Sequence, residues 1–232
     1  MLNREVGILG GMGPESTAYL FSKIIEITPA RRDQDHLRVI IDNNPKIPDR
    51  TEAILGRGPS PLPELEESIR NLEKCKVDVV AIPCNSIHHF YEQIQGMTNI
   101  PVIHLIEECV NYVKENIQNV QRVGLLATTG TIIGELYQKH FSEIGIGVLI
   151  PDQETQREIM DIIYGERGLK AGYIQANKAD LLEIARGMID SGAQVIIAGC
   201  TEIELAIGDE KNITIINPLQ ILASVVVERA TS

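Results

Sequence analysis

The 232-residue chain has little positive charge and no long apolar run. Lys and Arg total 21 against 32 Asp and Glu, so the net charge at pH 7 is −11. A chain of this charge repels a phosphate backbone instead of displacing its counterions, which disfavours nucleic-acid binding. No apolar run approaches the roughly 20 residues that cross a bilayer, so we expect no membrane span.

Targeting signals and cysteine are also scarce. The first residues lead directly into Val6 and Gly7 without a basic region or a cleavage site, so we expect a cytoplasmic protein. The four cysteines are Cys75, Cys84, Cys109 and Cys200, and they form no CxxC pair. This pattern predicts reduced thiols, and neither disulfides nor a structural zinc site.

Short runs rich in Val and Ile alternate with amphipathic helical segments along the whole chain. These runs are apolar almost throughout, which is typical of parallel strands covered on both faces. The sequence therefore predicts an α/β fold. The expected strands are residues 5–9, 37–41, 77–82, 102–104, 123–126, 147–150, 195–198 and 213–216.

The two halves of the chain resemble each other. VGIL at 6–9 matches VGLL at 123–126, VVAIPCN at 79–85 matches VIIAGCT at 195–201, and IPVI at 100–103 matches ITII at 213–216. The offsets are 117 (6 to 123), 116 (84 to 200) and 113 (100 to 213). This internal repeat predicts two similar lobes, each a mostly parallel sheet flanked by helices and related by pseudo-symmetry. We place residues 1–102 and 214–232 in the first lobe and 103–213 in the second, with the active site in the cleft between them.

Cys84 and Cys200 occupy equivalent places in this repeat. Each follows an apolar strand and precedes a helical pattern, where the positive end of a helix would lower the pKa of the thiol. Burial as a small apolar side chain is the alternative for one cysteine considered alone. Chance gives no reason for both halves to carry a thiol at the same point, so the pair predicts chemistry.

The other two cysteines fit core packing. Cys75 continues an apolar stripe through Leu65, Ile69 and Leu72, and Cys109 lies on an apolar helical face. A metal site could instead be drawn from Cys84, His88 and His89, but the sequence supplies no convincing further ligands.

A glycine-rich segment, GILGGMGP at 7–14, follows the first strand. It does not match GxGxxG because Ser16 stands at the last position, so a nucleotide cofactor is weakly supported. The segment predicts a tight turn into a helix with Pro14 in the first helical turn, either purely structural or with N–H groups that hold a carboxylate.

Five segments together carry a family resemblance: GILGGMGP at 7–14, NNPKIPDR at 43–50, PCNSIH at 83–88, VGLLATTGT at 123–131 and GCTE at 199–202. With these motifs the chain resembles the cofactor-independent aspartate/glutamate racemase family, and most closely its aspartate racemases. The resemblance covers nearly the whole chain and implies the same two-lobed α/β fold.

The resemblance implies interconversion of L- and D-aspartate without a cofactor or metal. One thiolate of the Cys84 and Cys200 pair would remove the α-proton while the other, as a thiol, protonates the opposite face, so the pair should be near-symmetric. Arg50 and Lys170 would bind the substrate carboxylates. The remaining implied substrate contacts are Met12, Asn85, Ser86, Thr128 and Thr201. A homodimer acting on a small acidic amino acid is expected.

Other functions stay open at this stage. The substrate could be glutamate or a range of amino acids, and maleate isomerases of the same superfamily also keep two cysteines. A non-catalytic amino-acid-binding regulatory protein is a further alternative. The chain departs from the usual family pattern at Ser86, Ile87 and Asn217, of which Ile87 bears on side-chain specificity.

Overall fold

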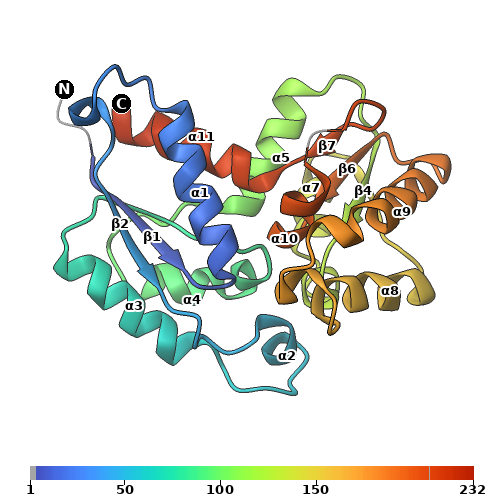
Figure 1. The fold of residues 1–232 in the computed structure, drawn as a ribbon, viewed down its shortest axis with the longest axis horizontal. Helices are drawn as coiled ribbons and strands as arrows, with labels where there is room; N and C mark the ends of the chain where they lie inside the picture. The colour runs from blue at the N-terminus through green and yellow to red at the C-terminus, as the bar shows by residue number, and fades with distance from the viewer. Residues whose placement is uncertain (1–3, 209) are drawn as a thin grey trace. The chain divides into compact units, whose positions relative to one another are not determined.

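The computed structural model describes residues 4–208 and 210–232, which divide into two compact units (Figure 1). The first unit contains the described residues up to Glu108 together with Leu219–Ser232, and the second contains Cys109–Pro218. No helix among the described residues is both long and apolar enough to cross a membrane.

Each unit is an α/β layer structure, as the sequence predicts. The first contains β1 (Val6–Gly10), α1 (Pro14–Ile27), η1 (Asp33–Asp35), β2 (Val39–Asn43), α2 (Arg50–Ile54), α3 (Leu62–Lys74), β3 (Val79–Ala81), η2 (Ser86–Phe90), α4 (Tyr91–Gly96), the start of α5 (Leu105–Asn116) and nearly all of α11 (Pro218–Thr231). The second contains the rest of α5, β4 (Arg122–Leu126), α6 (Thr129–Ile133), α7 (Leu136–Glu143), β5 (Gly147–Leu149), α8 (Gln153–Tyr164), η3 (Leu169–Ala171), η4 (Gln175–Asn177), α9 (Lys178–Asp190), β6 (Val195–Ala198), α10 (Thr201–Ile207) and β7 (Ile215–Ile216). The η elements are 3₁₀ helices.

The sheet of the first unit has the order β2-β1-β3, and all its strands are parallel. Alternate residues of β1 point to opposite faces, so both faces need a cover. Val6 and Ile8 pack with Leu20 of α1 and with α11, whereas Leu9 packs with α3. Figure 1 shows α1 and α11 on one side of this sheet and α3 on the other.

The second unit repeats this arrangement. Its parallel sheet has the order β5-β4-β6-β7, with α8 and α9 packed against Ile196 and Ala198 of β6. Val6 pairs with Val79 in the first unit, and Val123 pairs with Val195 in the second. The strand register therefore confirms the internal repeat that the sequence indicates.

Two details of the expected fold are wrong. Residues 102–104 form no strand, because the chain makes one parallel bridge from Val102 to Val80 and then enters α5 at Leu105. Cys75 is exposed and not part of the core, because α3 ends at Lys74 and the chain turns there. The apolar stripe of α3 stops at Leu72, which is buried.

The glycine-rich turn after β1 has the predicted form, with Gly13 as the N-cap of α1 and Pro14 in its first turn. Gly11 has a φ of +96°, and a Cβ there would lie 2.3 Å from the carbonyl of Asn44. Its N–H donates to Oγ1 of Thr17 at 2.9 Å. This N–H is thus used by the protein itself, which favours the structural interpretation of the turn.

Candidate functional site

In the first unit, Cys84 lies three residues beyond β3, at the carboxyl end of the sheet. The thiol is buried, and its Sγ lies 3.6 Å from Oγ of Ser86. Cys84 is followed by the short 3₁₀ helix η2 and not by the expected α-helix.

His88 fixes the backbone at Cys84. The N–H of Leu105 donates to Nε2 of His88 at 3.1 Å, so Nδ1 carries the ring hydrogen and donates to the carbonyl of Cys84 at 2.8 Å. Burial, with a smaller contribution from His104, lowers the pKa of His88 to about 3. His88 is therefore a neutral structural residue, and both of its ring nitrogens are engaged in hydrogen bonds that a metal site with Cys84 and His89 would have to break.

Arg50 is a buried cation in the first unit. It begins α2, and its guanidinium donates to the carbonyls of Met12, Ile47 and Pro48 at 3.1–3.4 Å. The Met12 carbonyl thus contacts a second predicted site residue, while its side chain packs in the core. Since α2 packs against η2, the structure brings Arg50 into the neighbourhood of the Cys84 segment.

Asn85 and Ser86 complete the predicted group of the first unit. Both are buried, and the carbonyl of Asn85 accepts from the N–H of His88 as η2 begins. These two residues directly follow Cys84 in the chain, where the backbone turns into η2.

In the second unit, Cys200 lies two residues beyond β6 and is the N-cap of α10. The predicted α-helix is present here, but the predicted low pKa is wrong. Burial and the charge of Glu202 raise the pKa of the Cys200 thiol well above its usual value, and the opposing effect of Lys170 is smaller. A thiol removed from water beside a carboxylate disfavours the thiolate.

Glu202 links three predicted site residues. Its Oε2 accepts hydrogen bonds from the Cys200 thiol and from the Thr201 hydroxyl, both at 3.1 Å. Its Oε1 forms an ion pair with Lys170, whose Nζ also lies 5.5 Å from the ring centre of Tyr164. Burial raises the pKa of Glu202, but the Lys170 ammonium and the hydrogen bonds outweigh this effect and lower it.

Sequence reasoning missed Glu202 and the structural role of His88. The available signal was position alone: Glu202 follows Cys200 by two residues, and His88 follows Cys84 by four. Lys170 is held by Glu202, a contact that the sequence did not predict.

Thr128 makes its contacts elsewhere in the second unit. It follows β4 and is the N-cap of α6, where its hydroxyl accepts from the N–H of Thr131 at 3.4 Å. Its Oγ1 also lies 3.2 Å from Oγ1 of Thr131. This capping role explains a hydroxyl residue at position 128 without any ligand.

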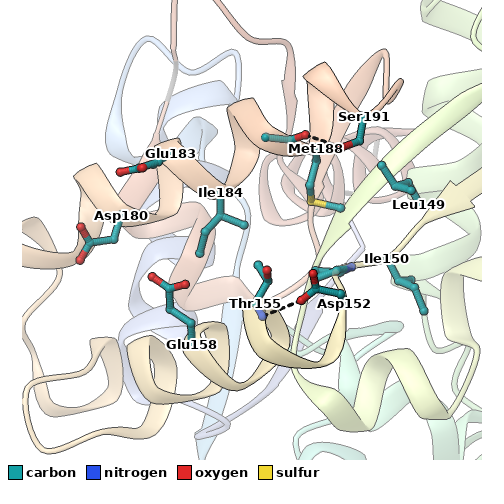
Figure 2. Close-up of a pocket in the computed structure, with 12 residues that line it drawn as sticks. Leu149, Ile150, Asp152, Thr155, Glu158, Asp180, Glu183, Ile184, Met188 and Ser191 are labelled. Atoms are coloured by element: carbon teal, nitrogen blue, oxygen red, sulfur yellow. Dashed lines mark hydrogen bonds between the residues drawn. The ribbon is translucent and has the colours of Figure 1, made fainter.

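A separate cavity of about 550 Å³ lies in the second unit between α8, α9 and the end of β5 (Figure 2). Figure 2 shows Glu158 of α8 on the side opposite Asp180 and Glu183 of α9, with Ile184 and Met188 also lining the cavity. None of the described residues that line it is a predicted site residue or a cation. An acidic substrate would be repelled here, so the cavity is not the candidate site.

Comparison with known proteins agrees with this geometry. The model of the Asp/Glu/hydantoin racemase family matches residues 9–226, so the chain belongs to this family. Membership supports the predicted class of enzyme, an isomerase of the amino-acid racemase type.

The individual relatives are racemases of different substrate specificity. The chain is 30% identical over 206 residues to the broad specificity amino-acid racemase RacX of Bacillus subtilis, covering 85% of each chain. The structure of Picrophilus torridus aspartate racemase is similar with a TM-score of 0.87 and 27% identity, covering 98% of this chain and 94% of that one. A glutamate racemase from Francisella tularensis shares the fold, with a TM-score of 0.66, 19% identity, and coverage of 98% and 81%.

Proposed function

We propose that the protein is a cofactor-independent aspartate racemase in which Cys84 and Cys200 are the two proton-transfer groups. The observation that carries the proposal is the equivalent placement of the two thiols, each just beyond the second strand of a matching β1–β3 and β4–β6 pair. Removing a proton from one face of a carbon and supplying one to the other requires two such groups. The likeness to an aspartate racemase supports the choice of substrate.

In the proposed reaction, the thiolate of one cysteine takes the α-proton of aspartate as the thiol of the other delivers its proton to the opposite face. The C–H bond on the first face breaks and a new C–H bond forms on the second, so the configuration inverts. The protonation states of the two cysteines are exchanged at the end. The reverse reaction uses the same groups in opposite roles.

Arg50 and Lys170 are the proposed partners of the two substrate carboxylates. The guanidinium of Arg50 is held by backbone carbonyls, which reduces the entropy lost when a carboxylate binds. The ammonium of Lys170 has three donor hydrogens, so it can contact Glu202 and a substrate carboxylate together.

The remaining contacts are proposed from hydrogen-bonding groups close to the thiols. Asn85, Ser86 and Thr201 would hold the α-carboxylate and the amino group, because each lies one or two residues from a cysteine. Met12 would contribute through its backbone. Thr128 has the weakest support because its hydroxyl caps α6.

A broad-specificity amino-acid racemase is the second candidate, favoured by the 30% identity to RacX. A panel of L-amino acids, incubated with the reduced protein and resolved by chiral chromatography, separates the two. We expect D-aspartate to form fastest, with glutamate and neutral amino acids at least tenfold slower. Comparable rates for neutral amino acids would replace the first candidate by the second, and no D-amino acid from any of them would refute both.

We also propose a homodimer in the cytoplasm. Cys84 and Cys200 must be reduced for this chemistry, and the cytoplasm keeps thiols reduced. Sedimentation of the purified protein tests the dimer, and a single monomeric species would refute it.

A further inference from the structure

The group that touches each thiol stands two residues further along the chain. In the first unit this residue is Ser86, which is neutral, and in the second it is Glu202, which is ionised. The two thiols therefore occupy equivalent positions but have electrostatically different neighbours.

We propose that Glu202 is a positioning residue that keeps Cys200 in the protonated form, and that Lys170 keeps Glu202 ionised as the acceptor. This inference rests on the proposed racemase function. Cys200 then begins the catalytic cycle as the proton donor.

The contacts around Cys200 support this role. The thiol donates to Oε2 of Glu202, and a carboxylate acceptor prefers the S–H form to a thiolate, which it repels. The carboxylate itself is buried and remains charged because Lys170 binds its other oxygen. The Thr201 hydroxyl donates to the same Oε2 and helps to fix its orientation.

The other charged groups near α10 act elsewhere. Glu204, on the same helix, acts on Cys109 and Tyr137, whose pKa values are raised mainly by burial. Helix α9 also packs against α10, but its charged residues are exposed or, for Lys178, partly exposed; the exposed ones are Asp180, Glu183, Arg186 and Asp190. From η3, the cation that faces the group is Lys170.

After Cys200 has given its proton to the α-carbon, its thiolate lies beside the Glu202 carboxylate. This arrangement is unfavourable, so recapture of a proton is favoured. The proton arrives either from solvent or, in the reverse reaction, from the α-carbon. Glu202 thus biases which thiol is charged between turnovers without touching the substrate.

The test follows the alkylation of each cysteine by iodoacetamide between pH 6 and 10, with the modified peptides quantified separately by mass spectrometry. In Glu202→Gln the midpoint for Cys200 should move at least one pH unit lower, and the midpoint for Cys84 should stay unchanged. In Lys170→Met the midpoint for Cys200 should also move lower, by less than in Glu202→Gln, because Glu202 without its cation takes up a proton and no longer repels the thiolate. Shifts of the same sign on removing an acid and on removing a base are expected of the ion pair and not of a change in net charge alone.

Matched variants keep the test decisive. Glu204→Gln makes the same change in the same helix, and Glu183→Gln makes it at an exposed site; neither should move the Cys200 midpoint. Glu202→Asp retains the charge and should lie closer to the wild type than Glu202→Gln does. If Glu202→Gln folds poorly, the Glu202→Asp and Lys170→Met shifts decide the question.

Activity gives a second readout. In Glu202→Gln the basic limb of the kcat profile should move to lower pH, because Cys200 loses its donor proton earlier. An unchanged or raised Cys200 midpoint in a folded Glu202→Gln protein would overturn the inference. A wild type that does not racemise any amino acid would overturn the proposed function instead, while the alkylation shifts would still be measured.

Discussion

The two halves of this chain share a strand order and a register but differ in what surrounds the thiol. Cys84 lies beside a serine hydroxyl, and its carbonyl is held by a neutral histidine. Cys200 lies beside an ionised glutamate that is paired with a lysine. The sheet thus sets where a thiol stands, and the residue two positions later sets its electrostatic environment. An internal repeat can keep the first property while the second diverges.

The strongest way to break this comparison is to remove each thiol in turn. Cys84→Ser and Cys200→Ser should each lower kcat for aspartate racemisation by about 10²–10⁴-fold, because a serine hydroxyl is a far weaker acid than a thiol and forms almost no alkoxide at neutral pH. Chiral chromatography of the product measures the loss. Cys75→Ser is the matched control, since Cys75 is exposed and should be silent. Full activity in either active-site variant would exclude a two-thiol reaction.

Substitution of Lys170 in the second unit should give the next largest effect. Lys170→Met should raise KM for aspartate by about 10- to 100-fold, the cost of one charge-assisted hydrogen bond. Initial rates over a range of substrate concentrations measure the change. Lys139→Met is the control, because Lys139 pairs with Glu135 at an exposed site. An unchanged KM would mean that Lys170 serves Glu202 and not the substrate.

His88 should contribute to the stability of the first unit and not to the reaction itself. Its pKa is about 3 in the folded protein and near 6.5 when unfolded, so the unfolded chain binds more protons between these values. The free energy of unfolding should therefore fall as the pH drops from 6.5 towards 3, by up to about 1.4 kcal/mol per pH unit. His88→Gln should be less stable at neutral pH by about 1–3 kcal/mol and should lose this slope.

Urea unfolding at several pH values measures both quantities for His88. A slope that is the same in His88→Gln and in the wild type would show that His88 is not buried as a neutral ring.

The smallest predicted effect concerns Ser86, which stands two residues after Cys84 as Glu202 stands two residues after Cys200. Ser86→Ala removes a neutral hydrogen-bond partner and should change kcat/KM by about 2- to 10-fold. The Cys84 alkylation midpoint should move by less than the Cys200 midpoint moves in Glu202→Gln. Equal shifts in the two variants would mean that the thiols have equivalent neighbours after all.

The sequence predicted the α/β class and the repeat because buried parallel strands leave long apolar runs. It failed at residues 102–104, where apolar composition could not show that the chain leaves the sheet after one bridge. It also failed at Cys75, where helical periodicity continued past the real helix end at Lys74.

The site was predicted less completely than the fold. The cysteines were found because each half of the repeat carries one, and Arg50 and Lys170 were found by resemblance. The link through Glu202 was missed because the contact between Lys170 and Glu202 joins residues 32 positions apart. The direction predicted for the shift in the pKa of Cys200 was wrong. A helix N-terminus can be recognised in the sequence, whereas burial and a neighbouring carboxylate cannot.

Racemisation of L-aspartate in deuterated water, sampled at early times, tests the two-thiol reaction most directly. If one thiol removes the α-proton and the other supplies the new one, D-aspartate should appear carrying α-deuterium while the remaining L-aspartate stays almost fully protonated. Deuterium that enters both enantiomers equally from the start would indicate a single base. Absence of both exchange and D-aspartate would contradict aspartate racemisation itself.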